Sequence, residues 1–250
     1  MESISLVIPA TPGDAIFLPE LLRAINQGTL LPNEIIISIS SAGDMPKALI
    51  EDIENAFGNV SKGSILLNRE MLLASGNRNK GSALASGDIV AFFDADDLPH
   101  PQLFQTVAFL FANRDIVHLN HRCTRDVLNT VPIEKIVTID SDILYPLYFP
   151  EGKFEDCVLH AGAYGINLPA PFTDVVTGHT YVRREVLEQV RFRDPDDKPF
   201  RKAEDYIFCM ETLFKFRKSA IIDSVLSFYR PSAERGQNRH GYKNVTYVSV

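Results

Sequence analysis

Short apolar runs and longer stretches of helical periodicity alternate along the first half of the chain. Runs rich in β-branched residues, short enough to be strands, lie at 3–8, 34–39, 64–67, 89–93 and 116–119. Stretches that repeat apolar or small residues at helical spacing lie at 14–25, 48–57, 76–85 and 102–113. Strands that alternate with helices over short links predict an α/β fold with a mostly parallel sheet covered on both faces.

The regular rhythm stops in the middle of the chain. Pro and Gly residues interrupt 121–167 repeatedly, which predicts strands, loops or a lid rather than a second domain. Helical patterns resume at 184–190 and 205–215. Two short apolar runs then read as closing strands, at 221–222 and 226–229. The polar tail that begins at Pro231 is expected to be mobile.

Composition narrows the function classes. A net charge of −7 without a basic tract argues against a general nucleic-acid binder. Cys123, Cys157 and Cys209 are odd in number and lack metal-type spacing, which favours free thiols in a reducing compartment. The chain opens without a signal-peptide pattern and holds no apolar run of about 18 residues. We therefore expect a cytoplasmic protein without a transmembrane segment.

Three carboxylates, Asp94, Asp96 and Asp97, follow directly on the apolar run at 89–93. Like charges at a strand end repel one another, and a divalent cation bound by oxygen ligands offsets them. Because residues i and i+2 of a strand share a face, Asp94 and Asp96 can address one ligand. Such a site at the carboxyl end of an α/β strand suits a diphosphate. The alternative is a polar loop that caps the next helix at Asp97 or His100.

Two further polar groups open predicted helices. Residues 76–81 read Gly-Asn-Arg-Asn-Lys-Gly, and a helix N-terminus there would place Arg78 near a diphosphate or a base. The alternative is a solvated helix start with a closely packed face of small residues. Glu204 and Asp205 begin a later helix, where the helix dipole favours acidic residues whatever their function.

The stretch 74–97, read in order, resembles the signature of family-2 glycosyltransferases. That signature runs from Ala-Arg-Asn through small residues and Gly-Asp or Gly-Glu to an apolar strand and Asp-Ala-Asp-Asp. The matching stretch here reads ASGNRNKGSALASGDIVAFFDADD. Further landmarks of the family have counterparts in the same order, at 6–9, 26–27, 34–36, 204–205 and 226–230. The resemblance thus covers nearly the whole chain and is weakest at 121–167.

The resemblance implies a GT-A fold, in which a Rossmann-like mixed sheet is flanked by helices in a single domain spanning 1–250. Residues 1–120 would bind the nucleotide sugar, 121–230 would form an irregular acceptor-binding half, and 231–250 would be a polar tail. The resemblance also implies Mn²⁺ or Mg²⁺ and a nucleotide-diphosphate sugar as donor. A UDP-sugar is favoured, and a GDP-sugar is the alternative.

The donor site is carried over from the resemblance residue by residue. Asp96 would bind the metal directly, and Asp94 would bind the ribose hydroxyls or reach the metal through water. The family's second strand commonly ends in an Asp that contacts uracil, but here Ser40 begins the sequence Ser-Ser-Ala. Ser40 or a backbone group would serve instead, or the base differs. The other expected pocket residues are Pro9, Thr11, Arg78 and Ala95.

The resemblance assigns the catalytic base to Asp205. One base that faces the donor from the far side removes the proton of the acceptor hydroxyl and gives inversion. Glu204 would orient Asp205 or contact the acceptor, and Asp97 would support the acidic cluster or face the acceptor. His179 is a candidate for the acceptor wall or an ordinary strand histidine. His240 would complete the metal shell or lie in a solvated tail.

The aromatic stretch 145–150 is read as an acceptor platform, as core, or as a patch that touches a membrane or a partner. The sequence therefore predicts a metal-dependent inverting glycosyltransferase that acts on a glycan or glycoconjugate, with peripheral membrane contact left open. A pseudo-transferase that binds sugar without turnover is the alternative. A nucleotide-sugar pyrophosphorylase is disfavoured, because 9–14 lacks the arginine of that class's N-terminal signature.

Overall fold

The computed structural model describes residues 2–122, 125–129, 138–154, 180–193, 204–231 and 234. Its strands are β1 (Ile4–Ala10), β2 (Glu34–Ile39), β3 (Gly63–Leu67), β4 (Ile89–Phe92), β5 (Leu98–Pro99), β6 (Ile116–Arg122), β7 (Thr138–Asp140), β8 (Thr180–Arg183) and β9 (Ser219–Phe228). Its α-helices are α1 (Leu18–Asn26), α2 (Lys47–Ala56), α3 (Ala74–Ser82), α4 (Leu103–Leu110), α5 (Ser141–Tyr148), α6 (Val186–Gln189) and α7 (Glu204–Lys215). Short 3-10 helices are η1 (Ala15–Phe17), η2 (Ala42–Asp44) and η3 (Arg125–Asn129).

The described strands form one mixed sheet in the order β3-β2-β1-β4-β8-β6-β9-β5, and β7 pairs with β9. Strands β1 to β4 pair in parallel, as the alternation of strands and helices predicts. Beyond them the pairing changes, because β8 runs antiparallel to both β4 and β6. The predicted α/β class with a mixed sheet is confirmed, while the expectation of a mostly parallel sheet holds only for the first half.

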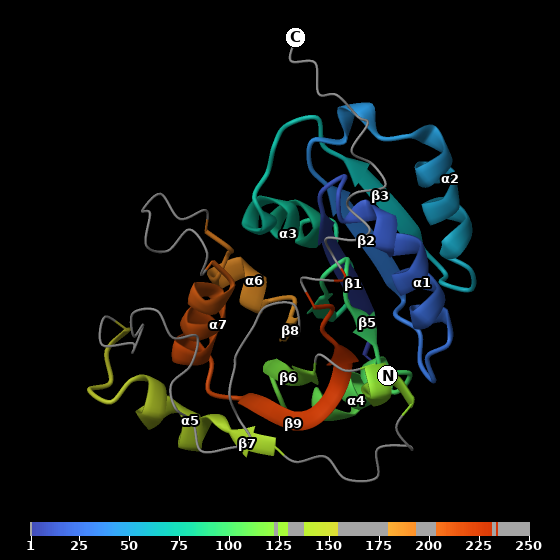
Figure 1. Ribbon diagram of the computed structural model, residues 1–250. Helices are drawn as coiled ribbons and strands as arrows, with labels where there is room; N and C mark the ends of the chain where they lie inside the picture. The colour runs from blue at the N-terminus through green and yellow to red at the C-terminus, as the bar shows by residue number, and fades with distance from the viewer. Residues whose placement is uncertain are drawn as a thin grey trace.

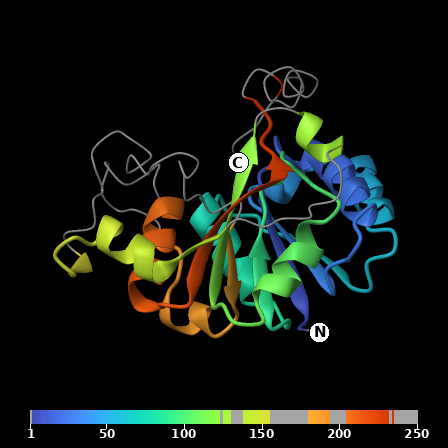
Figure 2. The same cartoon turned by 90° about the horizontal axis from the view of Figure 1, so that it is seen from below.

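Helices cover both faces of the sheet, which lies between two helical layers in Figures 1 and 2. Successive residues of β1 point to opposite faces. Leu6 and Ile8 pack in a core with α1, α2 and α4, whereas Val7 packs in a second core with α6 and α7. Burial on both faces explains why β1 and β2 are buried at every position.

Helix α3 packs closely on β1 because Gly81 has no side chain. A Cβ atom at Gly81 would lie 2.6 Å from Cγ1 of Val7, a distance that no packed core tolerates. The small-residue face predicted for this helix is therefore a packing surface. It fixes the helix against the sheet and so places Arg78, in the middle of α3, beside the end of β1.

The second half of the chain contains a helix that the sequence pattern does not predict. Helix α5 includes Pro146, and it ends at an aromatic cluster. Tyr148 and Phe149 are buried, and the Phe149 ring centroid lies 5.0 Å from that of Phe214 on α7. Of the three roles considered for 145–150, the structure shows core packing for these two aromatic residues.

The closing strands expected at 221–222 and 226–229 form one continuous strand, β9. Its pairing with β6 shifts register twice, so polar residues interrupt the apolar pattern without ending the strand. The distal end of β9 pairs with β5, which places Phe228 opposite Leu98. The helix expected at 184–190 is shorter, as α6. Within the described ranges, no helix is both long and apolar enough to cross a membrane.

Candidate active site

A cleft of about 220 Å³ opens at the carboxyl ends of β1 and β4, beside the start of α3. Parallel strands of an α/β sheet bring their carboxyl ends together at one edge, where such proteins bind ligands. The cleft is lined by Pro9, Ala10, Thr11, Asp14, Leu72, Ala74, Asn77, Arg78, Asp94, Ala95 and Asp96. The structure therefore gathers the predicted pocket residues of the first strand, of α3 and of the acidic run around one cavity.

Ser40 is the predicted pocket residue that does not line this cleft. Its side chain is buried, and its backbone N–H donates a hydrogen bond to the Ala10 carbonyl over 3.1 Å. The next residue, Ser41, has a φ of 52°, a left-handed conformation that turns the chain sharply. Ser40 therefore lies buried at the carboxyl end of β2 and does not line the cleft.

Asn77 ties the start of α3 to the ends of β1 and β2. Its side-chain nitrogen donates to the Ala10 carbonyl over 3.3 Å, and its side-chain oxygen accepts from the Ser38 hydroxyl over 3.0 Å. Asn77 is 2% exposed, so these bonds satisfy a buried amide. The sequence motif at 76–81 contains Asn77, but the pattern assigns it no role. Its place beside Arg78 is the signal that points to it.

Arg78 joins Asp94 of the acidic run to the start of α7. Its guanidinium Nη2 donates to Asp94 Oδ1 over 2.9 Å, and Nη1 lies 3.5 Å from Glu204 Oε1. The side chain is 5% exposed, and its cation lies 5.5 Å from the Phe192 ring centroid. Burial lowers the pKa of Arg78, but Asp94, Asp205 and Glu204 raise it above its ordinary value. The guanidinium therefore stays charged among three carboxylates.

Two nitrogen atoms of Arg78 keep unused hydrogen-bonding capacity. Nε and Nη1 are buried and make no hydrogen bond among the described residues, although Nη1 lies within ion-pair distance of Glu204 Oε1. A buried donor without an acceptor is costly, and such groups occur where a ligand completes the site. Because Arg78 lines the cleft, an anionic ligand there is the chemistry that fits.

The acidic run forms a tight turn whose members differ in exposure. The backbone N–H of Asp97 donates to the Asp94 carbonyl over 3.3 Å. The Asp94 side chain is 31% exposed, whereas Asp96 and Asp97 are buried. Asp97 Oδ1 accepts the backbone N–H of Arg230 over 2.9 Å. Asp97 therefore lies buried behind the turn, in contact with Arg230, and its support of the acidic cluster or contact with the acceptor stays a prediction.

The donor set at the turn fits a hard divalent cation. Asp94 and Asp96 both line the cleft and present oxygen ligands, which Mg²⁺ and Mn²⁺ prefer. Among the described residues, no three His, Cys, Asp or Glu side chains gather to hold a metal by themselves. Mg²⁺ is commonly held by one or two carboxylates together with substrate phosphates and water. The two carboxylates suit that mode of binding.

Glu204 and Asp205 lie in the first turn of α7. Both are partly buried, and Glu204 is the one whose carboxylate pairs with Arg78. Phe208 and Met210, further along α7, are buried in the second core, which anchors the helix to the sheet. The structure thus brings the start of α7, which carries the predicted base, beside the cleft. His179 and His240, the remaining predicted site residues, lie outside the described residues.

Solved structures of glycosyltransferases share this fold. The S. aureus TarS fragment 1–349 in complex with UDP-GlcNAc matches with a TM-score of 0.64 and 14% identity, over 99% of this chain and 62% of that one. Glucosyl-3-phosphoglycerate synthase of Mycobacterium tuberculosis, in complex with Mn²⁺, UDP and glucosyl-3-phosphoglycerate, matches with a TM-score of 0.54 and 18% identity, over 96% and 76%. The chain therefore spans about 62% of the TarS fragment. These matches confirm the predicted GT-A fold.

Sequence comparison gives a more specific relationship. The amylovoran biosynthesis glycosyltransferase AmsB of Erwinia amylovora is 24% identical over 249 residues, which cover 96% of this chain and 73% of AmsB. The family described as glycosyl transferase family 2 matches residues 5–191, a range that holds the cleft and its acidic turn. On this match the chain belongs to glycosyl transferase family 2.

Proposed function

We propose that the chain is a metal-dependent, inverting glycosyltransferase that moves a sugar from a nucleotide diphosphate to an acceptor hydroxyl. The observation that carries the proposal is the buried Arg78, which links Asp94 in the donor cleft to Glu204 on the base helix. The Arg78 guanidinium thereby holds the acidic turn and the start of α7 close to each other. Membership of glycosyl transferase family 2 supports the reaction class.

The donor is assigned to the cleft at the ends of β1 and β4. Arg78 lines the cleft, and its charged guanidinium favours a diphosphate there. Asp94 and Asp96 would hold Mn²⁺ or Mg²⁺, which would neutralise the charge of the departing diphosphate. A UDP-sugar is favoured, since the TarS and glucosyl-3-phosphoglycerate synthase structures hold UDP-GlcNAc and UDP.

The base is assigned to Asp205 in the first turn of α7. Arg78 ion-pairs with Glu204, the residue before it, and this contact fixes the start of the helix relative to the donor site. A single carboxylate that takes the acceptor proton on the face opposite the leaving group gives inversion at the anomeric carbon. The acceptor is assigned to the glycan or glycoconjugate class, because AmsB is named for amylovoran biosynthesis.

A pseudo-transferase is the second candidate, and one observation favours it. Ser40 stands where the family commonly has a base-contacting Asp, and it does not line the cleft. Such a protein would bind a nucleotide sugar without transferring it. Binding and turnover therefore have to be measured separately.

The decisive experiment screens UDP- and GDP-sugars by thermal shift with and without Mn²⁺. A ligand at about 100 times its Kd stabilises the folded state by about 2.7 kcal/mol, so one donor should raise the Tm only when Mn²⁺ is present. Asp96→Ala should abolish that shift. Asp52→Ala removes an exposed carboxylate paired with Arg23 and should leave it intact.

The results of the thermal-shift screen and of a transfer assay together distinguish the candidate functions. A metal-dependent shift together with sugar transfer supports the proposal. A shift without transfer to any acceptor of a glycan panel supports the pseudo-transferase. No shift with any nucleotide sugar contradicts the donor assignment.

A further inference from the structure

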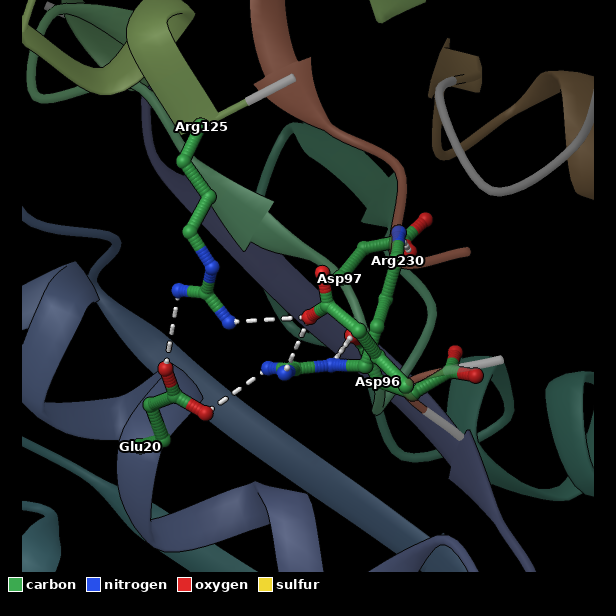
Figure 3. A network of polar contacts seen from close by, with 6 residues as sticks. Glu20, Asp96, Asp97, Arg125 and Arg230 are labelled. Carbon is green, nitrogen blue, oxygen red and sulfur yellow. Dashed lines mark hydrogen bonds and ion pairs between the residues drawn. The ribbon is translucent and has the colours of Figure 1, made fainter. Parts of the chain in front are cut away.

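A buried arginine lies directly behind the acidic turn, on the end of the closing strand. Arg230 follows β9 and is 3% exposed. Figure 3 shows it between Asp96 and Asp97 on one side and Glu20 of α1 on the other. In the sequence, Arg230 is the last residue of the landmark at 226–230. The structure gives it contacts to segments more than 130 residues away along the chain.

Arg230 holds the acidic turn through the backbone. Its side-chain Nε donates to the Asp96 carbonyl over 2.7 Å, while its own backbone N–H donates to Asp97 Oδ1 over 2.9 Å. The Asp96 carboxylate remains on the cleft side, where it lines the cavity. Arg230 therefore fixes the main chain of the residue whose side chain is assigned to the metal.

The guanidinium of Arg230 is itself anchored from the far side. Nη2 pairs with Glu20 Oε2 over 2.7 Å, and Nη1 lies 3.5 Å from Glu234 Oε2. Arg125 bridges the same two carboxylates over 3.3 Å each. The Arg230 cation also lies 4.7 Å from the Phe17 ring centroid. Two acids, a second arginine and a ring thus leave Arg230 little freedom to move.

We propose that Arg230 is a positioning residue that sets the geometry of the Asp94–Asp97 turn and thereby the affinity of the donor cleft for its cation. The effect on catalysis rests on the proposed function, but the effect on the turn does not. Residues behind metal ligands commonly control metal affinity by about 10–100-fold. A planar guanidinium suits this task, because its donors reach the Asp96 carbonyl and the Glu20 carboxylate at the same time.

A purely structural role is the alternative, and the chain offers a matched control for it. Arg183 donates to the Arg114 and Phe111 carbonyls, pairs with Glu2 and lies 5.8 Å from the Phe111 ring centroid. It thus makes the same kinds of contact as Arg230. Arg183 ends β8 opposite Ile89, the first residue of β4, and therefore lies at the edge of the sheet away from the cleft.

The test compares Arg230→Gln with Arg183→Gln in the full chain. Amide hydrogen exchange, measured without ligand, should be about tenfold faster in peptides covering 92–99 for Arg230→Gln, since local protection reports local opening. The same peptides should be unchanged in Arg183→Gln. Mn²⁺ binding in the presence of UDP, measured by calorimetry, should weaken by about 10–100-fold in Arg230→Gln alone.

Arg230→Lys provides a second variant, in case Arg230→Gln does not fold. It keeps a positive charge, but one ammonium group does not reproduce the two-sided guanidinium contact. Arg230→Lys should therefore fold while showing the same faster exchange at 92–99 and weaker Mn²⁺ binding than wild type.

Two results would overturn the positioning role. One is unchanged exchange at 92–99 in Arg230→Gln and Arg230→Lys. The other is an equal change in Arg183→Gln, which would mark a global loss of stability. A wild-type chain that binds no UDP or GDP with Mn²⁺ would instead contradict the proposed function, while the exchange result would still decide the role of Arg230 in the turn.

Discussion

At the scale of the residue, Arg78 determines how charge is balanced in the cleft. Its guanidinium stays charged beside Asp94, Asp205 and Glu204, so it competes with any cation for the Asp94 carboxylate. The same charge attracts a diphosphate. Under the proposed function, Arg78 would oppose metal binding in the absence of the sugar donor and would favour binding of the donor itself. A substitution of Arg78 should therefore change the affinity for the metal and the affinity for the nucleotide differently, and both affinities can be measured.

Replacement of Arg78 by Met should change the two affinities in opposite directions. Without the cation, Asp94 and Asp96 attract Mn²⁺ more strongly, because a neighbouring positive charge no longer offsets them. UDP binding should weaken by about tenfold, the loss expected for one charge-assisted contact. Calorimetry with Mn²⁺ alone and with UDP checks both.

Lys80→Met is the control for that variant. Lys80 lies on the same helix, pairs with Glu70, and its side chain is 41% exposed. Its removal should leave both affinities unchanged. Equal weakening of Mn²⁺ and UDP binding in Arg78→Met would show that the variant distorts the cleft.

The residues that sequence reasoning found are those that carry a local pattern. Asp94 and Asp96 follow an apolar strand, and Arg78 lies in a recognisable motif, so the chain itself marks them. Glu20 and Arg230 form an ion pair across 210 positions, and no local pattern predicts such a partner. Asn77 was visible in the motif, but its bonds to β1 and β2 depend on how α3 packs.

At the scale of the element, periodicity predicted most helices and strands of the first half, because those elements bury one clear face or both. It failed where the pattern is broken inside an element. Pro146 reads as a breaker yet lies in α5, and Asp223 and Ser224 read as a gap yet lie in β9. Tertiary packing decides such cases, since it outweighs local propensity.

The start of β2 contains a buried carboxylate that links three segments. Glu34 Oε1 accepts from Ser5 Oγ over 2.5 Å and from the Ser86 N–H over 2.6 Å, and Oε2 pairs with Lys62 over 2.7 Å. Burial raises the pKa of Glu34, but Lys62, Ser5 and Ser86 together lower it to about 2. Glu34 is therefore ionised in the folded chain well below its ordinary pKa of 4.5.

The pKa of Glu34 makes stability depend on pH in a defined direction. Because the folded pKa lies below the unfolded one, the contribution is complete above about pH 4.5 and disappears as the pH falls toward 2. Glu34→Gln should lower the free energy of unfolding by about 2–3 kcal/mol at pH 7 and by much less at pH 3. Urea denaturation at the two pH values measures this difference.

Glu51→Gln serves as the comparison for Glu34→Gln. Glu51 forms an exposed pair with Lys47, and surface pairs contribute little. It should show no such pH dependence. A deficit in Glu34→Gln that stays constant from pH 7 to pH 3 would contradict the lowered pKa.

At the scale of the whole molecule, one sheet joins the predicted donor and acceptor halves. Strand β4 pairs with β1 on one side and with β8 on the other. Helix α7 packs on the face that carries Phe92, so the acidic turn and the proposed base helix rest on the same strand. The relative position of the turn and the helix is therefore set by the core and by Arg78. Because the two lie on different elements, a substitution in α7 should affect sugar transfer without affecting donor binding.

Asp205→Asn tests that separation. The amide keeps the size of the carboxylate but accepts no proton, so sugar transfer should fall by about 10²–10⁴-fold, the contribution of a general base. Binding of UDP with Mn²⁺ should stay within about twofold of wild type, because Asp205 is assigned to the acceptor. Glu211→Gln, a change to a carboxylate on the same helix that pairs with Lys215, should leave transfer unaffected.

NMR of the product should show an inverted anomeric centre, since one carboxylate acting through the acceptor allows a single displacement. Full sugar transfer by Asp205→Asn would contradict the assignment of the base to Asp205. A retained anomeric configuration would contradict the single displacement, because retention requires a nucleophile on the protein.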